Sequence, residues 1–114
     1  MREPRERLRD ILEAIEYIER CARRGRQAFF EDELIQNWFV RHRQIIGEAA
    51  RALPAEIRDR AQEVPWSRIL GMRHILVHDY FSIDRQIVWD VVERDLPDLT
   101  RKVERLLADL GGQA

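Results

Sequence analysis

The residues best suited to chemistry are gathered in residues 73–80, which read RHILVHDY. Arg73 is a permanent cation whose planar guanidinium binds phosphate or carboxylate through paired hydrogen bonds. His78 suits proton transfer near neutral pH, because the pKa of imidazole lies near ~6.5. Asp79 and Tyr80 follow directly and add an acid and a hydroxyl group. This cluster therefore suits the binding of an anion combined with the movement of a proton.

The helix that carries the cluster is predicted to begin near Trp66. Arg73 then falls in the middle of an apolar stripe, in line with Leu70 and Val77. A buried arginine keeps its charge, so it needs an anionic partner or a polar cavity. Glu48, in the sequence IIGEAA of the preceding long helix, is a candidate partner. Such a pair would be purely structural or would orient Arg73 for function, and the spacing leaves both open.

The other residues of the cluster do not all lie on the same side of an ideal helix as Arg73. His78 lies about 140° from Arg73 on an ideal helix, so the two converge only through the length of arginine or irregular winding. Tyr80 returns to the Arg73 side, where its hydroxyl either lines a cleft or is satisfied within the core. Asp79 either tunes His78 or faces solvent.

The histidines do not form a convincing metal site. His74 and His78 are spaced i, i+4, but a zinc site needs a third or fourth ligand. Asp79 lies on another side of the helix, His42 is the remaining histidine, and the sequence has no CxxC. We therefore expect no metal and no cofactor, with His74 at the surface.

Composition places the chain among small globular proteins. The 114 residues suffice for one domain, and the 45% that are hydrophobic can form its core. Lys and Arg number 20 against 21 Asp and Glu, so the net charge is −1. This balance excludes a strongly basic coat, and any nucleic acid would have to be recognised by a local patch.

Cellular location is suggested by what the sequence lacks. Cys21 is the single cysteine, so no internal disulfide forms, which is typical of a reducing cytoplasm. We interpret Cys21 as a small core residue. The start, MREPRERLRD, is too charged for a signal peptide. No apolar run approaches the ~20 residues that a membrane span requires.

Apolar residues recur at helical spacing and predict an all-α fold. Four long helices are expected, at residues 5–24, 33–53, from about 66 and from about 85 to 110, with a short one at 55–62. Gly25 is expected to end the first helix and Asp32 to cap the second. Leu34 and Trp38 are among the apolar residues that mark the second helix. Pro97 must kink or interrupt the last.

Several blocks of the sequence resemble one known family. Arg73, His78 and Tyr80 match the R-x4-H-x-Y motif of the HEPN superfamily. The chain more closely resembles the HepT-type toxins of prokaryotic toxin–antitoxin systems. The blocks that carry this resemblance, in order and spacing, are RDILEAIEYIE (9–19), IIGEAARALP (45–54), VPWSRILGMRHILVHDYFSID (64–84) and VWDVVERDLPDL (88–99).

The resemblance implies a single compact HEPN domain over residues 1–114 and a symmetric homodimer. In that family Arg73 and His78 of both subunits would line a cleft and cleave RNA without a metal. A small nucleotidyltransferase of the MntA type would neutralise the toxin by attaching AMP to Tyr80. Some relatives carry Asn before the IIGEA block, where this chain reads VRHRQ, so Glu48, Arg41 or His42 would have to replace it.

Three hypotheses follow from these residues and this resemblance. The first is a cytoplasmic, metal-independent endoribonuclease toxin in which Arg73 and His78 are catalytic, supported by Glu48 and Asp79. The second is a non-catalytic HEPN subunit that binds RNA or a nucleotide beside a nucleotidyltransferase. The third is a helical dimerisation module in which Arg73 and Glu48 form only a structural pair.

Overall fold

The computed structural model describes residues 3–67, 69–70 and 89–111. Its elements are α1 (Pro4–Ala22), α2 (Arg26–Glu31), α3 (Glu33–Ala52), α4 (Ala55–Asp59), the π-helix η1 (Val91–Asp95) and α7 (Leu96–Gly111). Helical residues also resume at Trp66, as the sequence predicts. Every element in these ranges is a helix, so the predicted all-α class is confirmed.

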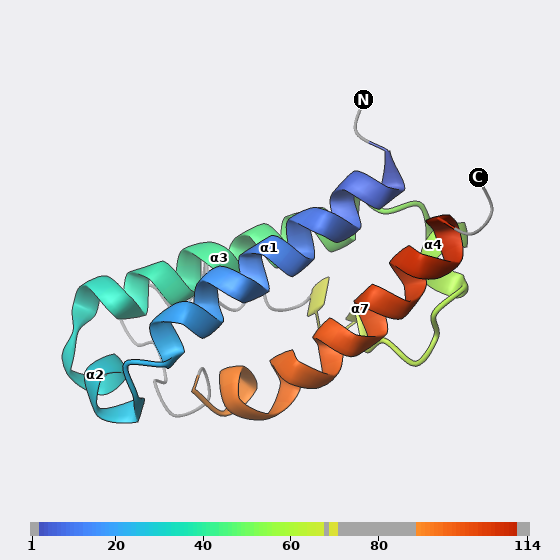
Figure 1. Cartoon of the computed structure of the whole chain (residues 1–114). Helices are drawn as coiled ribbons and strands as arrows, with labels where there is room; N and C mark the ends of the chain where they lie inside the picture. Colours follow the sequence, from blue (N-terminus) through green and yellow to red (C-terminus); the bar gives the residue numbers. More distant parts are fainter. Residues whose placement is uncertain (1–2, 68, 71–88, 112–114) are drawn as a thin grey trace.

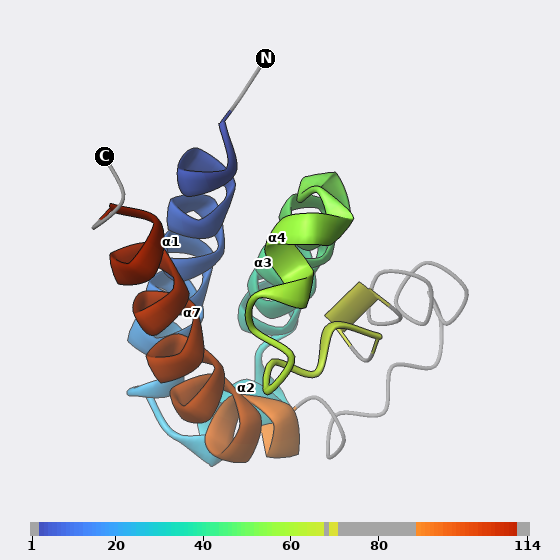
Figure 2. The same ribbon diagram turned by 90° about the vertical axis from the view of Figure 1, so that its right-hand side faces the viewer.

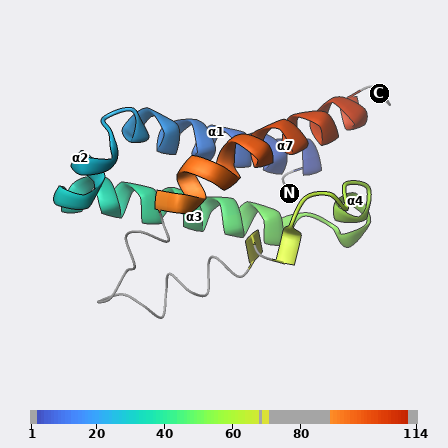
Figure 3. The ribbon, with the colours of Figure 1, turned by 90° about the horizontal axis from the view of Figure 1, so that it is seen from below.

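The long helix α1 organises the bundle. It runs antiparallel to α3 along most of its length and also packs against α7 (Figures 1 and 3). Figure 2, which looks along the bundle, shows α1 between α7 on one side and α3 on the other. The first turns of α1 and the last turns of α7 lie at the same end of the molecule.

The core face of α1 follows the predicted spacing. Leu8, Ile11, Ile15 and Ile18 are all at most 2% exposed. Steps of three and four residues keep them on one side of the helix. Cys21, one turn further on, is half-buried and packs against this core. Burial raises the pKa of its thiol, with a smaller opposing effect of Arg24, which fits a packing role.

The apolar face of α3 is narrower than predicted. Ile35, Phe39 and Ile46 are buried, but Leu34 is 79% exposed and Trp38 is 41% exposed. The apolar residues that mark this helix in the sequence therefore do not all face the core. Leu34 and Trp38 are four residues apart and form their own stripe, turned away from the stripe of Ile35 and Phe39. Trp38 reaches back across the surface, where its Nε1 donates a hydrogen bond to the Tyr17 carbonyl (3.2 Å).

A short helix occupies the segment predicted as a simple connection. The first helix ends at Ala22, and Gly25, with φ of 99°, turns the chain into α2. A six-residue helix is not stable by itself, so α2 depends on tertiary contacts. Asp32 then caps α3 as predicted, accepting a hydrogen bond from the Leu34 N–H (2.8 Å).

Buried Phe29 supplies the tertiary contact that α2 needs. Its ring stacks on Phe39 of α3 (4.7 Å between centroids) and on Trp89 (5.5 Å). Side chains from three distant parts of the chain therefore meet in one aromatic layer. Because Phe29 is only 1% exposed, its ring is a full member of the core.

Pro97 interrupts the last helix without ending it. In a regular α-helix its ring would clash with the carbonyl of Glu93, and it has no N–H to donate. The backbone instead widens into the π-helix η1 directly before α7, and Pro97 falls in the first turn of α7. The predicted interruption is confirmed and takes the form of a change in helix type.

Replacing Phe29 by alanine tests the importance of this aromatic layer. We expect Phe29→Ala to lower the free energy of unfolding by about 3–5 kcal/mol, because it leaves a cavity between α2, α3 and Trp89. Urea denaturation followed by circular dichroism measures this change. Leu34→Ala, at an exposed position of the same region, serves as the control and should change stability by less than about 0.5 kcal/mol. Equal losses in both variants would contradict the assignment of Phe29 to the core.

Candidate functional site

The residues predicted to do chemistry fall largely in the part of the chain that is not described. Arg73, His74, His78, Asp79 and Tyr80 all lie outside the described residues. Their predicted roles, and the pairing of Arg73 with an acid, therefore stay predictions. The described residues show instead what lies on each side of this segment.

Both ends of the segment are fixed in the core. Before it, the Trp66 Nε1 donates hydrogen bonds to the carbonyls of Arg58 and Ala61 (both 3.0 Å), and Ile69 is 1% exposed. After it, Trp89 is 8% exposed and stacks on Phe29. The chain therefore enters and leaves the motif segment from well-packed positions, as a site with a defined geometry requires.

Glu48, the predicted supporting acid, lies at the surface of α3. It is exposed, whereas its neighbours Gly47, Ala49 and Ala50 are buried. No hydrogen bond or ion pair joins its side chain to another residue in the described ranges. Because Glu48 is exposed, its carboxylate is accessible to water.

The buried charge of α3 is Arg43. Its side chain is only 6% exposed, and its Nε has no hydrogen-bond partner in the described part of the chain. Burial lowers the pKa of the guanidinium to about 10, and the negative charge of Asp95 in η1 offsets part of that shift. The arrangement holds a desolvated cation between α3 and the π-helix.

Sequence analysis overlooked Arg43, although a signal was present. Arg43 lies four residues after Phe39 and three before Ile46, two residues of the buried stripe. The same argument that singled out Arg73 on its apolar stripe would have singled out Arg43. Its partial compensation by Asp95 could not have been foreseen, because it depends on how α7 and η1 pack.

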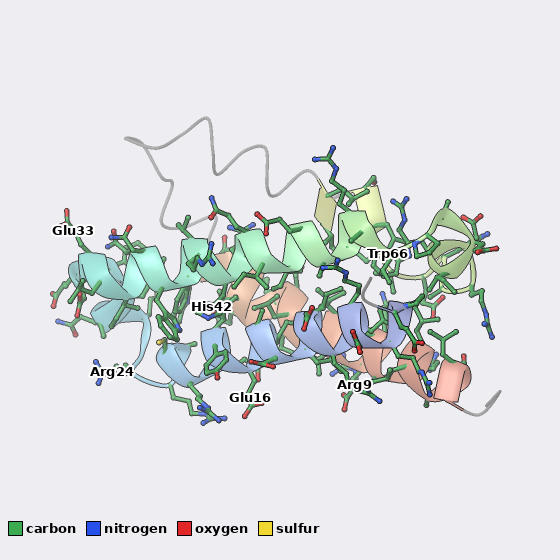
Figure 4. The ribbon with its side chains drawn as sticks, turned by 90° about the horizontal axis from the view of Figure 1, so that it is seen from above. Arg9, Glu16, Arg24, Glu33, His42 and Trp66 are labelled. Atoms are coloured by element: carbon green, nitrogen blue, oxygen red, sulfur yellow. The ribbon has the colours of Figure 1, made fainter. Side chains whose placement is uncertain are left out.

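His42 is the second buried polar residue of α3, at 8% exposed. Its Nδ1 lies 2.8 Å from the carbonyl of Trp38, and since a carbonyl only accepts, Nδ1 carries the proton. Its ring packs against Tyr17 (5.2 Å) and Trp38 (4.3 Å). Figure 4 shows His42 lying between α1 and α3. The histidine is thus part of an aromatic group on the α1–α3 face.

A cavity of about 260 Å³ lies beside α7, between the loop after α4 and η1. Two of its charged groups, Lys102 and Asp98, pair with each other. Lys102 donates to Asp98 (2.8 Å) and to the Glu63 carbonyl (2.9 Å). The hydrogen bond from Lys102 holds the pKa of the Asp98 carboxyl below its usual range. These contacts connect α7 to the loop that follows α4. We therefore assign the cavity a structural role and not a binding role.

The described residues contain neither a metal-binding cluster nor a membrane-spanning helix. No group of three or more His, Cys, Asp or Glu in those ranges is placed to hold a metal ion. No described helix is both long and apolar enough to cross a membrane.

The helices of the described ranges and the hydrophobic core that they share define a small all-α domain. Residues 11–106 match the family described as "Ribonuclease HepT-like". The chain therefore belongs to the HepT-like ribonuclease family and is a ribonuclease. The resemblance seen in the sequence is confirmed at the level of the family.

Two relatives that are named as ribonucleases are similar in sequence to this chain over most of its length. A protein of Caldanaerobacter subterraneus named a "Putative RNase" is 38% identical over 94% of this chain and 96% of its own length. "Probable ribonuclease HepT" of Thermococcus cleftensis is 39% identical over 87% of this chain and 91% of its own length.

Another relative is longer. A protein of Methanocaldococcus jannaschii, whose name joins a gamma-glutamylcyclotransferase to a "putative RNase", is 36% identical over 90% of this chain, which spans 47% of that protein. No solved structure matches the chain.

Replacing Arg43 and Asp95 separately tests the cost of the buried charge. Because a desolvated cation is costly, we expect Arg43→Met to leave the free energy of unfolding unchanged or higher. Asp95→Asn should lower it by about 1–3 kcal/mol, because Arg43 then lacks its compensating charge. Urea denaturation at neutral pH measures both changes. A large loss in Arg43→Met would show that the guanidinium contributes more than its burial costs.

The pH dependence of the same pair follows from the lowered pKa of Arg43. Between about 10 and the ordinary pKa of arginine, the unfolded chain binds more protons at this position than the folded chain. The stability of the wild type relative to Arg43→Met should therefore rise as the pH passes 10. Unfolding of both proteins at pH 8, 9, 10 and 11 measures the difference. A flat difference would contradict the lowered pKa.

Proposed function

We propose that this chain is a metal-independent endoribonuclease toxin of a toxin–antitoxin pair. The observation that carries this proposal is the family match over residues 11–106, which spans the whole motif segment. Arg73 and His78 are the proposed catalytic residues, and the proposed functional unit is one HEPN domain formed by residues 1–114. The proposed site of action is the cytoplasm, where RNA is available.

RNA carries the nucleophile that this mechanism needs. The 2′-hydroxyl attacks the adjacent phosphorus, a new O2′–P bond forms, and the bond to the leaving 5′-oxygen breaks. A histidine removes the proton from the 2′-hydroxyl, and another acid supplies one to the 5′-oxygen. Arginine stabilises the additional negative charge on the phosphate oxygens of the transition state. DNA lacks the 2′-hydroxyl and should not be cleaved.

A symmetric homodimer would supply both proton-transfer groups. Each subunit contributes one His78 and one Arg73, so one imidazole acts as the base and the other as the acid. Ile69 and Trp89, the described residues that flank the motif segment, are both buried.

Regulation would act on the same segment. The proposed partner is a nucleotidyltransferase of the MntA type, which attaches AMP to the Tyr80 hydroxyl. The added phosphate would pair with Arg73 and occupy the position of the RNA phosphate. Asp79 would tune the neighbouring His78, and exposed Glu48 would act from the surface of α3.

Cleavage by purified protein tests the catalytic assignment. We expect His78→Ala and Arg73→Ala each to slow RNA cleavage by about 10²–10⁴-fold, because each loses a proton-transfer or charge-stabilising group. Gel analysis of a labelled RNA measures the rate, and circular dichroism verifies the fold. Glu104→Ala, at an exposed position of α7, is the matched control and should cleave like the wild type.

Two outcomes of this assay would end the proposal. EDTA should leave the rate unchanged, so inhibition by chelation would rule out the metal-independent mechanism. Full cleavage by His78→Ala would remove its catalytic role. RNA binding without any cleavage by the wild type, lost only in Arg73→Ala, would favour the non-catalytic binding subunit. A loss of stability without any RNA binding would favour the structural module.

The role of Tyr80 is tested in growing cells. Tyr80→Phe removes the hydroxyl that would carry AMP but keeps the ring, so the variant should stay toxic when a cognate nucleotidyltransferase is co-expressed. The wild type should be neutralised under the same conditions and gain the mass of AMP. Colony counts and intact-protein mass spectrometry give these two results. Neutralisation of Tyr80→Phe would place the modification elsewhere.

A further inference from the structure

A groove of about 260 Å³ runs along the face between α1 and α3, outside the segment assigned to catalysis. One wall is formed by α1 residues at helical spacing, Asp10, Glu13, Ala14 and Tyr17, and the other by His42 and Ile45 of α3. The groove therefore combines acids, one aromatic ring and one imidazole. This combination is unlike the apolar core beneath it.

His42 gives the groove a defined hydrogen-bond acceptor. The side chain is 8% exposed, and its Nδ1–H is already used by the Trp38 carbonyl. In the neutral ring Nε2 therefore has a free lone pair. Nε2 makes no hydrogen bond to any residue in the described ranges, and His42 lines the groove. A group that donates hydrogen bonds would satisfy it.

The acidic residues that line the groove favour a hydrogen-bond donor that is positively charged. Glu13 is exposed at the rim and forms no ion pair with another described residue, and Asp10 lies one turn away on the same wall. The Tyr17 ring lies in the same wall and already holds the Arg20 guanidinium, 5.4 Å from its centroid, so the contacts left for a ligand are the carboxylate and the imidazole. A carboxylate and a lone pair together suit a planar cation that donates several hydrogen bonds.

The surroundings indicate that this cation belongs to a protein. Trp38, whose ring lies 4.3 Å from that of His42, is 41% exposed, and Leu34 one turn earlier is 79% exposed. A free amine would leave both apolar side chains in water, whereas a protein surface would cover them. RNA is disfavoured, because Glu13 and Asp10 would repel its phosphates. The volume of the groove suits one side chain better than a whole small molecule.

We propose that the groove between α1 and α3 is a docking site for an arginine side chain of a partner protein. The guanidinium would pair with Glu13 and donate to Nε2 of His42. Apolar residues beside that arginine would cover Trp38 and Leu34. Every described residue that lines this groove lies outside residues 73–80, and the proposal does not depend on catalysis by Arg73 and His78.

The first test uses small probes on the whole chain in solution. Titration with N-acetyl-arginine methylamide should give saturable NMR shifts of the Trp38 side-chain N–H. The lysine analogue should bind more weakly, and the glutamine analogue should not bind. Glu13→Gln should weaken binding by about five- to tenfold, since one charge contact is lost. Glu104→Gln, which removes the same charge from α7, is the matched control and should bind like the wild type.

Removing the positive charge of Arg41 should have the opposite effect on binding. It is exposed on α3, one turn before Ile45, so it opposes a cation in the groove. Arg41→Gln should therefore tighten binding of the arginine probe. Absence of a saturable shift up to ~50 mM, or equal binding of all three probes, would overturn the proposal.

The second test identifies what occupies the groove. A photo-reactive amino acid at Leu34 should cross-link, in cells, to a protein other than this chain. The cross-linked peptide should contain an arginine near the attachment point, and the yield should fall in Glu13→Gln but not in Glu104→Gln. A cross-link to RNA, a cross-link only to a second copy of this chain, or a yield that does not depend on Glu13 would overturn the proposal.

Discussion

The stacking of Phe29 on Phe39 and Trp89 is the contact on which the arrangement of the chain depends. Phe29 belongs to a six-residue helix that could not persist without burial, and Trp89 is the first described residue after the motif segment. One aromatic layer therefore fixes the turn between α1 and α3 and the position of Trp89, the first described residue after the motif segment.

The buried Arg43 shows that the core is not optimised for stability alone. Its guanidinium is desolvated, its Nε has no partner within the described ranges, and Asp95 compensates the charge only in part. That acid sits in η1, whose irregular winding follows from Pro97. A proline on the last helix, a π-turn and a charged residue on α3 are thus linked physically, and a regular helix at η1 would place Asp95 elsewhere.

The spacing of apolar residues was sufficient to predict the long helices. In α1, for example, Leu8, Ile11, Ile15 and Ile18 mark the buried face directly. The spacing failed for α2, where a single residue, Phe29, provides the burial and no period can be seen. It also failed for Leu34, because an apolar type does not reveal which of two adjacent stripes faces the core. The motif residues were predicted by type and spacing and by family resemblance. The arrangement of Arg73 and His78 stays a prediction, because both lie outside the described residues.

The two proposed partners, RNA and an arginine of another protein, would use different charges of the chain. The chain has a net charge of −1, so the proposed binding of RNA would rely on local cations and not on bulk attraction, and Arg73 is the proposed cation. The wall of the groove that carries Glu13 would instead repel RNA phosphates and attract a cation. An acidic wall is therefore compatible with a ribonuclease, because it would keep phosphates away from the groove around His42.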